Sequence, residues 1–285
     1  MIRKVILVAV AFLLAVAACV AYVAYSLAAP DPTFVGDPPA DLPVSKISFE
    51  GDQGAQLHGW FVPADQPRAV VILMHGIRAN RVQMLHRARF LHAAGYAVLL
   101  YDSRAEGEST GSAITLGHLE SRDARTAVQL ARSLAGTQRA AIIGVSLGGA
   151  AAILADPPLD VNALVLESVY PTIDQAIANR LSTRAGLLRT LFAPILTAAI
   201  PVRLGFSPME LRPVDHVGNL KMPKFFIFGS ADRSTTLVES LELFSHAAEP
   251  KQMWSIDGAG HVDLDAFAGD EYRKRVLRFL SAALN

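Results

Sequence analysis

The sequence has a single cysteine, Cys19, so the chain can form no internal disulfide and must depend on its hydrophobic core for stability. It also has no net charge, because 26 basic and 26 acidic side chains balance. A neutral chain gives no electrostatic reason to bind nucleic acid. No repeat or low-complexity stretch occurs, and no histidine, cysteine and carboxylate cluster has metal-ligand spacing. We therefore expect no nucleic-acid partner, no metal and no organic cofactor, and oligomeric state stays open.

Hydrophobicity is concentrated at the N-terminus. No charged residue lies between Lys4 and Asp31, and residues 5–29 form a continuous apolar run. At about 1.5 Å per residue, such a helix could cross a hydrocarbon layer of about 30 Å. The sequence predicts a single transmembrane anchor at 5–29. Because Arg3 and Lys4 precede the run, the rest of the chain is expected outside the cytoplasm.

Two other fates of this segment stay open. Small residues at 26–28 could form the cleavage site of a signal peptide, which would make the protein secreted. Residues 16–19 resemble a bacterial lipoprotein processing box, which would leave Cys19 as a lipidated first residue. The following stretch, 30–43, has five prolines and no periodicity, and it predicts an extended tether to a domain at 44–285.

From residue 44 onward, strand patterns alternate with helical ones, which predicts an α/β fold with a mostly parallel central sheet and helices on both faces. Alternating segments at 46–50 and 57–62 predict an antiparallel hairpin at one edge. Short apolar runs predict the buried strands, at 69–74, 97–101, 140–144, 163–167, 225–229 and 252–256. Residues 168–223 far exceed an ordinary connection of about 2 to 6 residues and predict a small inserted lid.

The strand at 140–144 runs into Gly-Val-Ser-Leu-Gly and then a helix of small residues. This context is typical of a nucleophile elbow, in which a sharp turn pushes a serine oxygen out of the sheet. Gly144 and Gly148 give room for the tight packing that the turn requires. We predict Ser146 as the nucleophile and the backbone N–H of Leu147 as the first donor to an oxyanion.

With these motifs in order, residues 46–284 resemble the α/β-hydrolase superfamily, and more closely its bem46-like and S33 aminopeptidase-like serine hydrolases. The resemblance implies the chain order serine, acid, histidine, each on a loop after a strand. It makes His261, in the loop after the last strand, the base. It makes Asp232, just past the strand at 225–229, the acid, with Glu167 in reserve.

The resemblance also implies an oxyanion loop at His75-Gly76-Ile77. The N–H of Ile77 is then the second oxyanion donor, and His75 and Gly76 support the loop. Two departures from the family pattern stand out. Ala105 replaces the first glycine of D-x-R-G-x-G-x-S, and the proline common after the acid is missing. Both leave the substrate class open.

Together these features predict a membrane-anchored serine hydrolase of the esterase, lipase or thioesterase kind. It would cleave acyl bonds through an acyl-enzyme on Ser146, with carboxylic or lipid-like esters favoured as small acyl substrates. The alternatives are a peptidase or amidase of S33 type and a non-catalytic membrane-bound binding protein that has kept the fold.

Overall fold

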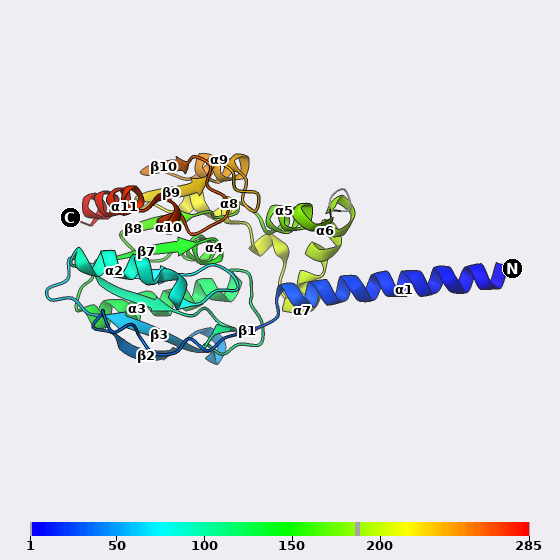
Figure 1. Ribbon diagram of the computed structural model, residues 1–285, viewed down its shortest axis with the longest axis horizontal. Helices are drawn as coiled ribbons and strands as arrows, with labels where there is room; N and C mark the ends of the chain where they lie inside the picture. Colours follow the sequence, from blue (N-terminus) through cyan, green and yellow to red (C-terminus); the bar gives the residue numbers. More distant parts are fainter. Residues whose placement is uncertain (1, 186–188, 285) are drawn as a thin grey trace.

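The computed structural model describes residues 2–185 and 189–284. Figure 1 shows a body built on one large sheet, a long N-terminal helix that extends away from it, and a group of short helices beside the end of that long helix. The sheet has eight strands in the order β10-β9-β8-β7-β4-β5-β3-β2. In chain order these are β2 (Ser45–Glu50), β3 (Gln56–Val62), β4 (Val70–Met74), β5 (Ala97–Tyr101), β7 (Ala140–Val145), β8 (Ala163–Glu167), β9 (Lys224–Gly229) and β10 (Lys251–Ile256).

The sheet is parallel except at the edge formed by β2 and β3, which pair antiparallel to each other, and β3 also runs antiparallel to β5. The predicted parallel sheet with its edge hairpin is therefore confirmed. The central strands are buried on both faces: in β4, Val70 and Ile72 belong to one core, and Val71 and Leu73 belong to the other. This is why those strands appear in the sequence as unbroken apolar runs.

Helices cover both faces of the sheet. One core holds apolar residues of α2 (Leu85–Ala93), α10 (Leu264–Ala268) and α11 (Asp270–Ala283). The other core holds those of α3 (His118–Ala135), α4 (Leu147–Leu154) and α9 (Leu237–His246). The stretch predicted as an insertion contains α5 (Ile173–Ala185), α6 (Arg189–Ala198), α7 (Ile200–Leu204) and α8 (Pro213–His216). Residues 187 and 188 of the apolar centre of that stretch lie outside the described residues.

The prediction of a transmembrane anchor at 5–29 is wrong. The segment is the helix α1 (Ile2–Leu27), which is 26 residues long. Within 2–185 and 189–284, the structure contains no helix whose length and hydropathy would suffice to span a membrane. The apolar run is used partly by the domain itself, because Val23 and Leu27 pack against its core and Ala28 is buried.

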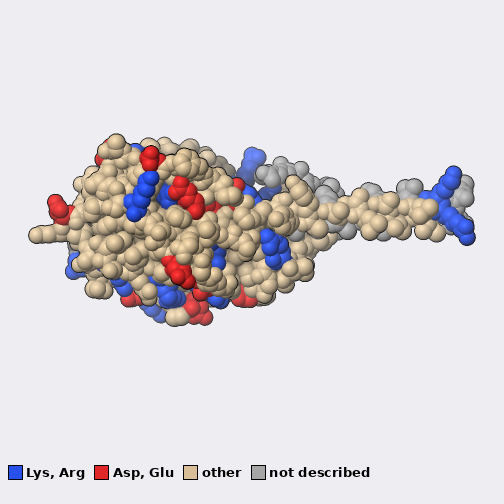
Figure 2. Space-filling view, turned by 90° about the horizontal axis from the view of Figure 1, so that it is seen from below, with Lys and Arg blue, Asp and Glu red and all other residues tan. Residues whose placement is uncertain are grey.

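The prediction of a single-pass membrane protein with its domain outside the cytoplasm depended on that anchor and is therefore wrong as well. Figure 2 shows basic side chains at the far end of α1, where Arg3 and Lys4 lie, and charges of both signs scattered over the body. Cys19, the residue of the lipoprotein alternative, lies within α1, and its side chain is outside what the structure describes.

The segment predicted as a tether takes part in the fold. The short strand β1 (Asp31–Pro32) pairs in parallel with β6 (Glu106–Gly107). The N–H of Asp31 donates to the carbonyl oxygen of Ala105 at 2.7 Å, and that of Thr33 to Gly107 at 2.8 Å. The chain after α1 is therefore fastened to the domain.

A buried ionic network connects α2 with the sheet and α11. The guanidinium of Arg87 donates to both carboxylate oxygens of Glu167, at 3.0 and 2.7 Å, and to those of Asp263, each at 3.1 Å. The hydroxyl of Tyr272 donates to Glu167 at 2.5 Å. The side chains of Arg87 and Glu167 are each only 1% exposed. A buried pair of this kind is costly to break, because removal of one partner leaves an uncompensated charge.

We expect Arg87→Ala to lower the free energy of unfolding by about 3 to 5 kcal/mol, because the Glu167 carboxylate would stay buried without its partner. Urea denaturation at neutral pH measures this. The matched control is Arg89→Ala on the same helix, because Arg89 pairs with Asp41 at 2.6 Å in an exposed position. That variant should lose at most about 1 kcal/mol. Equal losses in the two variants would contradict the structural importance of the buried network.

Candidate active site

Ser146 lies in the sharp turn between β7 and α4. Its φ of 48° and ψ of −107° are unusual for a residue other than glycine, and its side chain is nearly buried. A Cβ at position 144 would lie 2.6 Å from the Cα of Gly149, and one at position 148 would lie 2.7 Å from the carbonyl carbon of Met74. Glycine is therefore required at Gly144 and Gly148. These close approaches let α4 begin directly against β7 and β4, with Ser146 at the tip of the turn.

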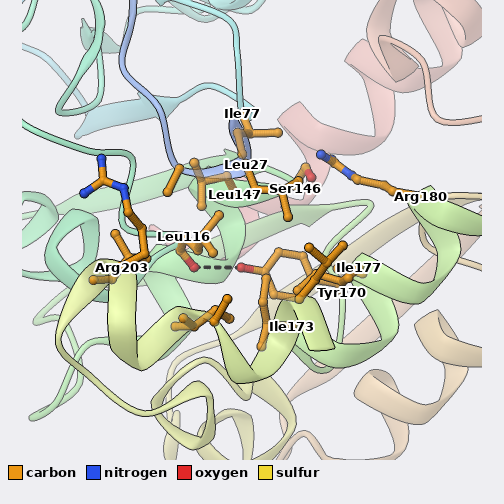
Figure 3. A pocket seen from close by; sticks show the side chains of 16 residues that line it. Leu27, Ile77, Leu116, Ser146, Leu147, Tyr170, Ile173, Ile177, Arg180 and Arg203 are labelled. Atoms are coloured by element: carbon orange, nitrogen blue, oxygen red, sulfur yellow. Dashed lines mark hydrogen bonds between the residues drawn. The ribbon is translucent and has the colours of Figure 1, made fainter. Parts of the chain in front are cut away.

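Two backbone N–H groups beside Ser146 are unused. Leu147 is the first residue of α4, where N–H groups have no partner inside the helix. Ile77 lies in the turn after β4. Neither N–H donates to any residue within the described ranges. Ile77, Ser146 and Leu147 line one pocket, and Figure 3 shows them gathered on the same side of it. Two free donors beside a serine are the arrangement that a tetrahedral oxyanion needs.

His75 supports the turn that carries Ile77. The imidazole is fully buried, and its Nδ1–H donates to the carbonyl oxygen of Gly76 at 2.7 Å. Its Nε2 accepts the N–H of Ser103 at 2.9 Å, which assigns the proton to Nδ1. Burial lowers the pKa of His75, so the ring is neutral. The N–H of Gly76 donates to Oε1 of Gln83 at 2.8 Å, a support that the sequence did not indicate.

Asp232 and His261 are directly joined. Nδ1–H of His261 donates to Oδ2 of Asp232 at 2.8 Å, and the Asp232 side chain has no exposed surface. The other carboxylate oxygen accepts the N–H groups of Ser234 at 2.7 Å and Thr235 at 2.9 Å. The carboxylate is thus fixed by its own loop and orients the imidazole, whose second nitrogen is left for another partner.

The three residues follow strands of the same parallel sheet. Ser146 follows β7, Asp232 follows β9 and His261 follows β10, and these strands are parallel through β8. Their carboxyl ends therefore meet at one edge of the sheet. The hydroxyl of Ser146 has no hydrogen bond to any residue that the structure describes. Catalytic hydrogen bonds are often long until substrate binds.

The other carboxylates near His261 in sequence, and the reserve acid, have different partners. Glu167 and Asp263 both bind Arg87. Asp257 accepts the hydroxyl of Ser230 at 3.0 Å. Asp232 is thus the carboxylate that binds His261. In the described part of the chain, no three His, Cys, Asp or Glu side chains are placed to hold a metal ion.

The pocket around Ser146 is lined mainly by aliphatic side chains. They come from the end of α1, the loop of Ile77, the start of α4 and the helices α5, α6 and α7. The full lining is Leu27, Ala28, Ile77, Leu116, Ser146, Leu147, Tyr170, Ile173, Ala176, Ile177, Arg180, Leu196, Ala199, Ile200, Arg203 and Leu204. The Tyr170 hydroxyl donates to the carbonyl oxygen of Leu116 at 2.9 Å, and Arg180 extends toward Ser146 (Figure 3). No Asp or Glu lines this pocket within the described residues.

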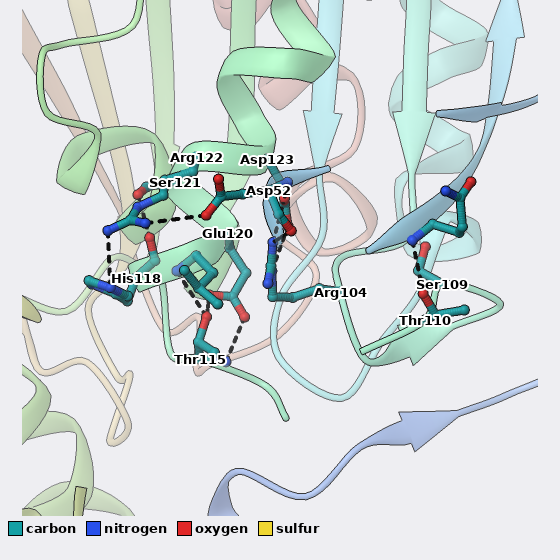
Figure 4. A network of polar contacts seen from close by, with 12 residues as sticks. Asp52, Arg104, Ser109, Thr110, Thr115, His118, Glu120, Ser121, Arg122 and Asp123 are labelled. Atoms are coloured by element: carbon teal, nitrogen blue, oxygen red, sulfur yellow. Dashed lines mark hydrogen bonds and ion pairs between the residues drawn. The ribbon is translucent and has the colours of Figure 1, made fainter. Parts of the chain in front are cut away.

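The loop after β5 is fixed by polar contacts. Arg104 donates to both oxygens of Asp123, at 2.7 and 2.6 Å, and to the carbonyl oxygen of Asp52 at 3.0 Å (Figure 4). Ala105, which stands where the family pattern has glycine, has a φ of 60°. The backbone at Ala105 therefore adopts the left-handed conformation that glycine takes most easily, at a cost of about 1 to 2 kcal/mol.

Glu106 is a buried carboxyl group that sequence reasoning missed. It is fully buried, and one of its oxygens accepts the N–H of Arg78, the residue after Ile77. The other oxygen has no hydrogen-bond partner in the described structure. Burial raises the pKa of Glu106 to about 8. The only signal in the sequence was a carboxylate between the small residues Ala105 and Gly107.

This fold and this site define the class of α/β-hydrolases. A family model described as serine aminopeptidase, S33, matches residues 65–207. The chain belongs to this family and is a hydrolase, which confirms the resemblance found in the sequence.

The relatives cover different shares of the chain. The uncharacterized protein YfhR of Escherichia coli O157:H7 is 28% identical over 90% of this chain and 86% of its own length. A monoacylglycerol lipase of Mycolicibacterium smegmatis is 33% identical over 37% of this chain and 39% of its own. Among solved structures, the Pyrococcus furiosus esterase Pf2001 matches with a TM-score of 0.73 and 23% identity, covering 90% of this chain and 100% of that one. The last likeness shows a shared fold.

The pKa of Glu106 leads to a prediction for stability. The folded protein holds this proton up to about pH 8, whereas the unfolded chain releases it near the usual value of 4.5. Stability of the native protein should therefore fall between these values, by up to about 1.4 kcal/mol per pH unit. Glu106→Gln removes this dependence, so the free energy of unfolding of the variant relative to the native protein should rise from about pH 5 to pH 8. Urea denaturation at several pH values measures the difference, and a constant difference would contradict the raised pKa.

Proposed function

We propose that this hydrolase is a serine esterase that cleaves carboxylic esters through an acyl-enzyme on Ser146. The observation that carries the proposal is the hydrogen-bonded pair of His261 and Asp232, which lies at the same carboxyl ends of the strands where Ser146 follows β7. The unused N–H groups of Ile77 and Leu147 beside the serine complete the set of groups that acyl transfer needs.

In the proposed mechanism, His261 takes the proton of Ser146 as the serine oxygen attacks the ester carbonyl carbon. Asp232 stabilises the imidazolium that forms, and the N–H groups of Ile77 and Leu147 hold the negative oxygen of the tetrahedral intermediate. When this intermediate collapses, His261 returns the proton to the leaving alcohol. Water, activated by the same histidine, then attacks the acyl-enzyme and releases the acid.

The lining of the pocket favours an ester over a peptide with a free N-terminus. An aminopeptidase must hold a charged amino group, which calls for a carboxylate in the site. Among the described lining residues there is no carboxylate, and the charged side chains are Arg180 and Arg203. The similarity to the Pyrococcus esterase and to the mycobacterial monoacylglycerol lipase supports the same choice.

A peptidase is the second candidate, because the matching family model is described as a serine aminopeptidase. The two are separated by comparing p-nitrophenyl esters with aminoacyl p-nitroanilides as substrates of the purified full chain. Faster cleavage of the anilides would make the protein a peptidase. Cleavage of neither, together with no reaction at Ser146, would favour the binding protein that has kept the fold.

We predict that a fluorophosphonate probe labels the native protein and leaves Ser146→Ala unlabelled, because only the activated serine reacts. Ester hydrolysis should fall at least about a thousandfold in the same variant. Ser230→Ala is the matched control, since this serine lies in a neighbouring loop and binds Asp257. Labelling of Ser146→Ala as strong as that of the native protein would exclude Ser146 as the nucleophile.

The acid is tested by Asp232→Asn, which keeps the shape of the side chain but cannot fix the imidazole in the same tautomer. We expect kcat to fall by about 10⁴. Asp257→Asn is the control, because Asp257 lies four residues before His261 and binds Ser230 instead. If the two variants lost activity equally, the role of Asp232 would be general loop support.

A further inference from the structure

The end of the N-terminal helix forms one wall of the pocket that contains Ser146. Leu27, the last residue of α1, and Ala28 after it both line the pocket, and Ala28 is only 2% exposed. Figure 3 shows Leu27 on the side of Ile77 and Leu147. The wall from α1 therefore borders the space that an acyl chain on Ser146 would occupy.

The opposite wall comes from the inserted helices. Ile173 and Ile177 of α5 and Leu196 of α6 face the same space. The helix α1 packs against α6 and α7, and the guanidinium of Arg203 in α7 lies 4.9 Å from the ring centre of Tyr25. The pocket is thus closed between two parts of the chain that lie far apart in the sequence.

Residues 25–33, here called the N-terminal strap, are held at several points. The N–H of Ile114 donates to the carbonyl oxygen of Ala28 at 3.0 Å, and β1 pairs with β6. The guanidinium of Arg78 donates to the carbonyl oxygen of Ser26 and lies 3.8 Å from the carboxylate of Asp31. Because Arg78 follows Ile77 directly, the strap is fastened to the oxyanion loop itself. The strap is therefore a built wall of the site.

The chemistry of the pocket points to its ligand. Aliphatic side chains dominate the lining, and the hydroxyl of Tyr170 already has a partner in Leu116. Such a surface recognises hydrocarbon, and each methylene group taken out of water improves binding by roughly a factor of four.

We propose that the N-terminal strap is a substrate-binding element that selects esters with an extended aliphatic acyl chain, and that Leu27 limits the length of that chain. The inference rests on the proposed esterase function. It assigns to α1 a role in specificity, and it names the substrate class as aliphatic acyl esters.

The test compares p-nitrophenyl acetate, butyrate, octanoate and laurate with the full chain and two variants. Leu27→Trp, which would fill the pocket, should lower the ratio of kcat/KM for octanoate to that for acetate at least tenfold. Leu27→Ala, which would enlarge it, should shift the preferred chain to greater length. A folding defect would not shift the preferred chain length in opposite directions in the two Leu27 variants. Leu14→Trp is the matched control, because Leu14 lies on the same helix with 65% of its surface exposed.

Binding of the fluorescent fatty acid cis-parinaric acid gives a second readout that needs no hydrolysis. Leu27→Trp should weaken this binding at least tenfold relative to Leu14→Trp. If no ester is cleaved but binding weakens in this way, the esterase proposal fails and the strap still binds the acyl chain. If esters are cleaved but neither chain preference nor binding changes in the Leu27 variants, the strap proposal is overturned and the esterase proposal stands.

Discussion

The close approach of α4 to β7 is the constraint on which the rest of the site depends. Gly144 and Gly149 face each other where a Cβ on either would collide with the backbone of the other. This contact forces the chain through a turn so tight that Ser146 has a positive φ. The same turn begins α4 at Leu147, which lines the pocket beside the serine. One packing contact between glycines thus places both Ser146 and the unused N–H of Leu147.

His261 is positioned by different contacts, because its loop follows the edge strand β10. Asp263 lies two residues after His261 and accepts the N–H groups of Asp265 and Ala266, which begins α10. Its carboxylate also binds Arg87 of α2, which in turn binds Glu167 at the end of β8. The buried ionic network therefore fixes the loop of His261 relative to the middle of the sheet. The network therefore positions the loop of His261 in addition to stabilising the fold.

The sequence was sufficient for the strands of the sheet but not for contacts between distant segments. A run such as 69–74 is buried on both faces, so its apolar pattern alone predicted β4. The apolar run at 5–29 was misjudged because hydropathy does not tell what a side chain packs against, and Val23 and Leu27 pack on the protein's own core. The pairing of β1 with β6 was not predicted either, since two residues have no periodicity. Glu106 was missed because its carboxyl group is enclosed by residues that lie far away in the sequence, such as Arg78.

Ala105, where the chain departs from the family pattern, lies in a segment that is hydrogen-bonded to the strap. Residues 105–107 contact the strap on one side, because the carbonyl oxygens of Ala105 and Gly107 accept the N–H groups of Asp31 and Thr33. On the other side, the Glu106 carboxyl accepts the N–H of Arg78, the residue after Ile77. A non-glycine residue held at positive φ persists only where its surroundings determine its conformation, and such residues gather at functional sites. The strap and the loop of Ile77 therefore share one support, so the strap wall of the pocket and the N–H of Ile77 are positioned together.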